Sequence, residues 1–132
     1  MQKELVYDRM TNAEKEVANV LEELKIQWSF EQPIFVWDEN KRPRVWAPDF
    51  FLKNFGIYIE VCGSTNFNYE YRKEIFNKNG HQVIFLHLFK SSDKWKNHLI
   101  KYLQLFTTVR YQNLKANTAF KIKILLMNKK YH

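Results

Sequence analysis

Two apolar arms joined by a short turn constrain the fold of this chain more than any other feature. Residues 46–52 (WAPDFFL) and 57–63 (IYIEVCG) are rich in aromatic and β-branched side chains, which predicts two strands of a hairpin. Each arm carries one acidic residue, Asp49 in the first and Glu60 in the second. A lone carboxylate in a buried strand is costly unless something pairs with it. We therefore expect the two acids to lie together around a shared cation.

The register of this hairpin can be derived from the alternation of side chains across a strand. If Asp49 lies opposite Glu60, then Leu52 meets Ile57, and residues 53–56 form a four-residue loop, an ordinary hairpin length. In this register one face of the hairpin is apolar and the other carries both acids. A shift by one residue would destroy that separation.

Pro48-Asp49, followed after ten residues by Glu60-Val61-Cys62, resembles the signature of the PD-(D/E)xK nuclease superfamily. The resemblance implies an α/β fold of the restriction-endonuclease-like type, in which helices flank a small mixed central sheet. Its αβββαβ core would cover about residues 11–90, with a basic C-terminal helix and strand in residues 91–132. We expect the whole chain, residues 1–132, to form a single nuclease-like domain.

The resemblance also implies a chemistry. Asp49 and Glu60 would bind Mg²⁺, with Mn²⁺ as a substitute, and the main-chain carbonyl of Val61 would add a ligand. A water activated by the metal would hydrolyse a phosphodiester bond of DNA, with RNA not excluded, as in restriction, repair, resolvase or homing endonucleases. A homodimer is the family expectation, because cutting both strands takes two sites.

Cys62 stands where the motif has lysine. A thiol has no cationic form, and beside two carboxylates it should stay protonated. Either Lys73, next to Arg72 on the following helix, replaces the lysine, or the protein is a catalytically inactive nucleic-acid-binding protein of the same fold. We favour a working enzyme. A third alternative is a basic scaffold protein whose two acids pair with Lys53 and Arg44.

A capping box begins the first predicted helix. Thr11 would cap it and Glu14 would reach back to the Thr11 backbone, giving a helix over about residues 12–25. The resemblance makes Glu14 a candidate catalytic residue, because most members carry an acid on this helix, but a plain capping role explains it equally well. The other elements expected are a lead-in at 1–10, one or two strands within 26–37, a charged turn at 38–44, helices at 67–79 and 93–106, and strands at 83–89 and 118–127.

Charge is distributed unevenly along the chain. The net charge is +7, and the part up to Cys62 has 8 basic and 11 acidic residues, against 13 and 3 from Gly63 onward. This asymmetry indicates a polyanionic partner, although a solvated lysine-rich surface is the ordinary alternative. The candidate nucleic-acid contacts are Lys41, Arg42, Arg44, Arg72, Lys94, Lys96 and Lys101.

Membrane and secretory functions are not expected. No apolar run is long enough to span a bilayer, the first residues do not resemble a signal peptide, and the single cysteine indicates a reducing compartment. We therefore expect a cytoplasmic protein. Its aromatic residues, 17% of the chain, could stack on nucleic-acid bases, but most fall at positions expected to face the core.

Overall fold

The structure is a computed structural model that describes residues 2–63, 67–88 and 94–109. The chain divides into two compact units, Met1–Lys96 and Asn97–His132. The first unit contains the predicted site. That the whole chain forms one domain stays a prediction, and the predicted strand at 118–127 lies outside the described residues.

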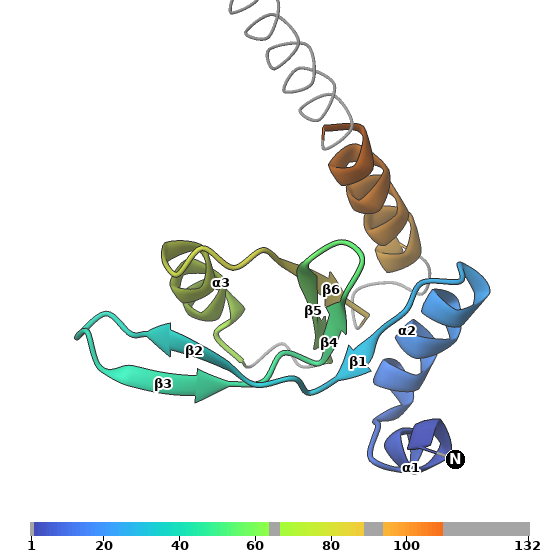
Figure 1. Ribbon diagram of the computed structural model, residues 1–132, viewed down its shortest axis with the longest axis horizontal. Coiled ribbons are helices and arrows are strands. Elements are labelled where there is room, and N and C mark those ends of the chain that lie inside the picture. The colour runs from blue at the N-terminus through green and yellow to red at the C-terminus, as the bar shows by residue number, and fades with distance from the viewer. Residues whose placement is uncertain (1, 64–66, 89–93, 110–132) are drawn as a thin grey trace, which may run out of the picture. The chain divides into compact units, whose positions relative to one another are not determined.

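A four-stranded mixed sheet lies at the centre of the first unit (Figure 1). The strand order is β1-β4-β5-β6; β4 pairs antiparallel with β1 and β5, and β5 pairs parallel with β6. The predicted class, α/β with a small mixed sheet, is confirmed. The strands are β1 (Ser29–Phe30), β4 (Phe50–Leu52), β5 (Ile57–Cys62) and β6 (Val83–His87).

The β4–β5 hairpin has the register derived from the sequence. Leu52 pairs with Ile57 and Phe50 with Ile59, so the same register, extended by one residue, places Asp49 opposite Glu60. Gly56 closes the loop with φ of 69°, a conformation that glycine adopts without a steric penalty.

The prediction that residues 46–52 form one continuous strand is wrong. Strand β3 (Pro43–Trp46) pairs with β2 (Ile34–Trp37) in a separate two-stranded antiparallel sheet, and β4 begins only at Phe50. Pro48 explains the break, because proline has no N–H to donate to a strand partner. Residues 47–49 therefore carry the chain from one sheet to the other.

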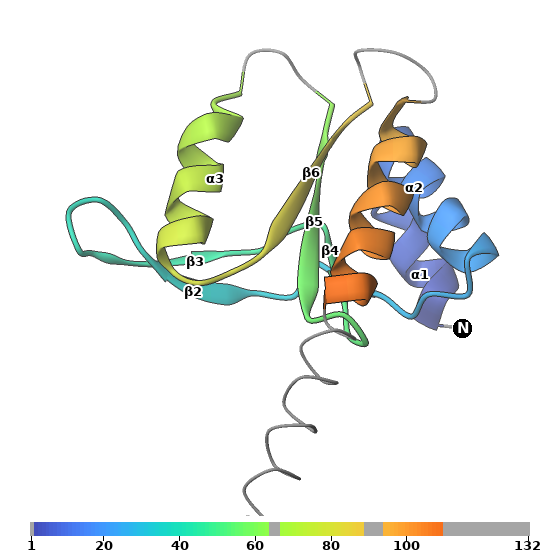
Figure 2. The same ribbon diagram turned by 90° about the horizontal axis from the view of Figure 1, so that it is seen from above.

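Helices lie on both sides of the four-stranded sheet, with α1 and α2 on one side and α3 on the other (Figure 2). The predicted capping box is present in α2 (Asn12–Glu23): Glu14 N donates to Thr11 Oγ1 over 3.2 Å, and Thr11 N donates to Glu14 Oε1 over 3.0 Å. Residues 2–8 were expected to be a lead-in, but they form helix α1 (Gln2–Asp8). Helix α3 (Tyr69–Lys78) ends before Gly80, whose φ is 76°.

The core on the α3 side joins both sheets. Ile34 and Val36 of β2 pack in one cluster with Tyr58 and Cys62 of β5 and with Phe76 of α3. The inner face of the β2–β3 hairpin is thus tied to the strand that carries Glu60.

The basic helix expected at 93–106 covers residues 94–109. Its buried side chains include Trp95, Leu99 and Leu103. Lys94, Lys96 and Lys101 are exposed, as expected for residues off the apolar stripe.

Candidate active site

Asp49 lies in the bend before β4 and is hydrogen-bonded both to β5 and to Glu31, the residue directly after β1. Its Oδ2 accepts a hydrogen bond from the backbone N–H of Val61 over 2.7 Å, and its main-chain oxygen accepts one from Glu31 N over 3.0 Å. Burial raises the pKa of the Asp49 carboxyl to about 7; the Val61 N–H opposes the shift, while the charges of Glu60 and Glu14 add to it. The carboxyl is therefore poised between its two protonation states near neutral pH.

Glu60, in the middle of β5, is buried, with only 9% of its side chain exposed. Its Oε1 lies 3.0 Å from Nη2 of Arg72 on α3. Burial raises the pKa of Glu60, and the charge of Glu14 raises it further, against the opposing effect of Arg72. The net direction is upward, so the ion pair does not fully offset the cost of burying this acid.

The guanidinium of Arg72 is held in place by two aromatic rings. Its Cζ lies 4.7 Å from the ring centroid of Trp46 in β3 and 5.2 Å from that of Phe76 in α3, distances suited to cation–π attraction. Among the described residues its buried Nε atom has no hydrogen-bond partner. The β2–β3 hairpin, through Trp46, thus helps to aim a cation at Glu60.

The charge of Glu14 acts on both strand acids, Asp49 and Glu60. Its carboxylate caps α2 through Thr11 N, and its charge raises the pKa values of Asp49 and Glu60. The structure therefore brings together the three predicted acids from α2, the bend before β4, and β5. The capping role is confirmed, and a catalytic role stays a prediction.

The donor set has the chemistry that a hard cation prefers. Mg²⁺ is commonly held by one or two carboxylates and completes its coordination with water and phosphate oxygens. Asp49 and Glu60 are such a pair of carboxyl groups, and the charge of Glu60 raises the pKa of Asp49. Within the described ranges, no group of three or more His, Cys, Asp or Glu side chains is placed to hold a metal ion, so Glu14 does not complete a three-carboxylate group. The role of the Val61 carbonyl stays a prediction.

Cys62 is fully buried, and its Sγ lies 3.8 Å from the main-chain oxygen of Glu60. Burial, followed by the charges of Glu60 and Asp49, raises the pKa of the thiol to about 12. The thiol is therefore neutral at physiological pH and cannot supply the positive charge of the motif lysine.

The cation beside Glu60 is Arg72, one of the predicted nucleic-acid contacts. Lys73, the predicted replacement for the motif lysine, is exposed on α3. Helical spacing could not separate these neighbours, since both border the face that contains Phe76. Arg72 lies against the rings of Trp46 and Phe76, and the position of Trp46 depends on the two-stranded β2–β3 sheet.

Lys41 and Arg42 of the predicted basic loop lie in the turn between β2 and β3, whereas Arg44 lies in β3; all three are exposed. Arg44 Nε lies 3.1 Å from Asp38 Oδ2. The scaffold alternative paired Arg44 with a strand acid, and this pairing is wrong, because Arg44 bonds Asp38 and Glu60 bonds Arg72.

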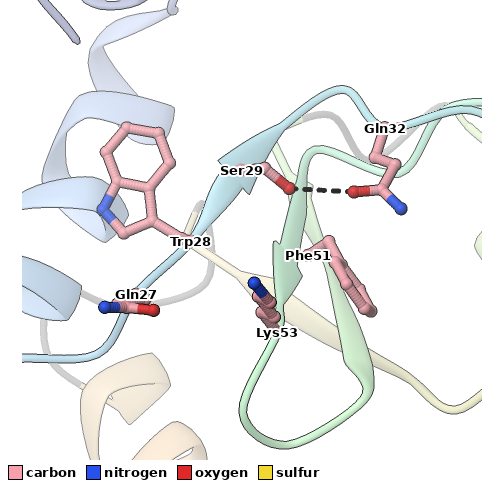
Figure 3. A pocket seen from close by; sticks show the side chains of 6 residues that line it. All are labelled: Gln27, Trp28, Ser29, Gln32, Phe51 and Lys53. Atoms are coloured by element: carbon pink, nitrogen blue, oxygen red, sulfur yellow. Dashed lines mark hydrogen bonds between the residues drawn. The ribbon is translucent and has the colours of Figure 1, made fainter.

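A hollow of about 620 Å³ borders strands β1 and β4 (Figure 3). Phe51 lies on its wall, two residues after Asp49 in the chain. Ser29 Oγ donates to Gln32 Oε1 over 3.1 Å. The hollow combines aromatic, amide and ammonium groups, and its lining residues are Gln27, Trp28, Ser29, Gln32, Phe51 and Lys53.

Comparisons of the chain with protein-family models, with curated proteins and with solved structures found no match. In the part of the chain that the structure describes, none of the helices has the length and apolar character needed to cross a membrane.

Proposed function

We propose that this chain is a Mg²⁺-dependent DNA endonuclease with a restriction-endonuclease-like core. The observation that carries the proposal is the pairing of Asp49 and Glu60: two carboxyl groups in opposed positions, both with raised pKa values, beside the guanidinium of Arg72. Perturbed acids next to a fixed cation are typical of catalytic sites.

The order of elements supports the proposed core. Helix α2, strands β1, β4 and β5, helix α3 and strand β6 follow one another as αβββαβ, with the β2–β3 hairpin inserted after β1. This order and the mixed sheet are those expected from the resemblance.

In the proposed site, Asp49 and Glu60 would hold the metal, and the main-chain carbonyl of Val61 would be a further ligand. Mg²⁺ bound there would supply an activated water and charge neutralisation at the phosphate. The Val61 N–H keeps Asp49 oriented. Arg72, whose Nη2 lies 3.0 Å from Glu60 Oε1, would take the part of the motif lysine as the cation of the site.

The remaining candidates act on the polymer outside this centre. Lys73 is placed for a phosphate contact from the exposed side of α3, and the loop cations Lys41 and Arg42 for contacts further along the strand. RNA is the alternative polymer, and a homodimer would allow cleavage of both strands.

A plasmid assay tests the proposal. Purified protein is incubated with supercoiled plasmid and Mg²⁺ or Mn²⁺, and compared with Asp49→Asn and Glu60→Gln, which keep side-chain size and remove charge. The matched control is Glu74→Gln, at an exposed acid of α3 that pairs with Lys78. We expect each site variant to lose at least about a hundredfold in nicking rate and the control to match the wild type. Equal nicking by wild type and Asp49→Asn would refute the proposal.

The second candidate is a catalytically inactive nucleic-acid-binding protein of the same fold. The neutral, buried Cys62 favours it, since it removes the motif cation, and so does the bond that engages Glu60 with Arg72. This candidate predicts salt-dependent DNA binding by wild type and Asp49→Asn alike, with no cleavage under any divalent metal.

A further inference from the structure

The outer face of the β2–β3 hairpin is apolar and exposed to solvent. Phe35 is 75% exposed, Trp37 60% and Val45 59%. Phe35 and Val45 are direct cross-strand partners, and Trp37 lies on the same face as Phe35, two residues along β2. Figure 1 shows the hairpin extending to one side of the four-stranded sheet. A contiguous face of this kind indicates a contact surface, whereas single exposed apolar residues do not.

The outer aromatic rings are not needed for the core. The alternate residues of β2, Ile34 and Val36, are buried at 9% and 1% exposure and pack against α3 and β5. Because the inner face already fastens the hairpin, burial in the fold does not account for the rings of Phe35 and Trp37.

The backbone behind both rings is bonded to the segment that follows α3. The side-chain amide of Asn79, just after α3, accepts from Trp37 N over 2.8 Å and donates to Trp37 O over 3.0 Å. His81 Nε2 lies 3.4 Å from Phe35 O. A face fixed before binding loses less conformational entropy on contact with a ligand.

The turn between β2 and β3, beside these rings, exposes two cationic side chains. Asp38 Oδ1 accepts from the backbone N–H groups of Asn40 and Arg42, each over 2.9 Å, which shapes the turn and leaves Lys41 and Arg42 exposed. The acids of the turn have partners within the protein, since Asp38 also bonds Arg44 and Glu39 accepts from the Tyr71 hydroxyl. Exposed positive charge next to flat apolar rings matches a polyanion that carries planar groups.

We propose that this hairpin binds unpaired nucleotides of the DNA substrate, with bases stacked on Phe35 and Trp37 and phosphates on Lys41 and Arg42. The two ring positions are about 6.6 Å apart along the strand, so each can take one base. A duplex keeps its base faces stacked inside the helix, whereas single strands offer them to aromatic side chains. The inference rests on the proposed function for the identity of the polymer, and it names the substrate class as DNA with a single-stranded segment.

Binding is measured without cleavage, which separates this inference from the proposed function. A fluorescein-labelled twelve-nucleotide single strand of mixed sequence and the matching duplex are titrated in EDTA at several salt concentrations. The face variant is Phe35→Ser with Trp37→Ser, the turn variant is Lys41→Ala with Arg42→Ala, and the control is Leu5→Ser, at a residue that is 68% exposed on α1. Thermal unfolding of each variant verifies that it is folded.

We expect the face variant to bind the single strand at least about tenfold more weakly, and to bind the duplex within about twofold of the wild type. The turn variant should bind both more weakly and should lower the salt dependence by about two phosphate contacts. The control should match the wild type. Unchanged single-strand binding by the folded face variant would overturn the inference. So would light scattering in which the wild type is a dimer and the face variant a monomer, because a second copy of the chain would then cover this face. If Asp49→Asn and wild type bind the strand alike and neither protein cleaves, the nuclease proposal fails while this inference stands.

Discussion

Arg72 of α3 and Glu60 of β5 form an ion pair in which Nη2 lies 3.0 Å from Oε1 and the guanidinium stacks on Trp46. The pair joins α3, the four-stranded sheet and the β2–β3 hairpin at one point. Only 16% of the Arg72 side chain and 9% of the Glu60 side chain are exposed, so water screens the interaction weakly.

Arg72→Met should lower the free energy of unfolding by about 3 kcal/mol, because it leaves a buried carboxylate without its cation. Adding Glu60→Gln to Arg72→Met should recover a large part of that loss. Urea denaturation of the two single variants and the double variant measures the coupling. Lys73→Met, at the exposed neighbour, is the control and should stay within about 0.5 kcal/mol of the wild type. Strict additivity of the two site substitutions would show that the ion pair is not energetically coupled.

The pH dependence of stability should carry the signature of Asp49. Its pKa is about 7 in the folded protein, against an ordinary value of 3.8, so between these values the folded state binds more protons than the unfolded state. The contribution of Asp49 to the free energy of unfolding is therefore fully present below about pH 3.8 and is lost as the pH rises toward 7. Melting temperatures from pH 4 to 8 should show a decline that is shallower in Asp49→Asn, while the raised pKa of Glu60 contributes in the same direction and remains.

A divalent cation should reverse this loss. At pH 8, above the pKa of about 7, the Asp49 carboxyl is ionised, and we expect Mg²⁺ or Mn²⁺ to raise the melting temperature of the wild type by mass action. The increase should be much smaller at pH 5, where Asp49 is protonated, and absent in Asp49→Asn. An equal increase at both pH values would place the ion at another site. Cleavage should rise with the same apparent pKa, which belongs to the coupled acids rather than to one residue.

Glu14→Gln separates the two roles of this residue. Glutamine can still accept from Thr11 N in the capping box, so stability should change little, whereas loss of the charge should lower the pKa of Asp49. Thr11→Ala should instead cost about 1 kcal/mol of stability and leave the Asp49 titration in place. NMR titration of the Asp49 carboxyl carbon, with urea denaturation, measures both. An unchanged Asp49 titration in Glu14→Gln would confine Glu14 to capping.

Asn79→Ala tests the attachment of the β2–β3 hairpin. The substitution removes both hydrogen bonds to the Trp37 backbone, and we expect a loss of about 1–3 kcal/mol, because a typical hydrogen bond contributes about 0.5–1.5 kcal/mol. Amide hydrogen exchange at Trp37 should accelerate far more than exchange at Ile59 in β5. Uniform acceleration at both amides would mean that the hairpin and the sheet open together.

The sequence by itself determined the features that depend on neighbours along the chain. The capping box of Thr11 and Glu14 and the β4–β5 register are local, because spacing, alternation and turn length decide them. Asp49 and Glu60 are placed opposite each other by the same register. The strand break after Trp46 is also encoded locally, in Pro48, although the apolar residues on both sides of it predict one continuous strand.

Only the tertiary structure decided which cation meets Glu60 and which aromatic rings stay outside. Arg72 and Lys73 are neighbours on one helix, and what separates them is the ring of Trp46, brought over α3 by a second sheet. Likewise, Phe35 and Val36 are equally apolar in sequence, and the side on which α3 packs makes one a surface residue and the other core. Long-range packing sets these outcomes, because a side chain's environment depends on elements that the local pattern does not specify.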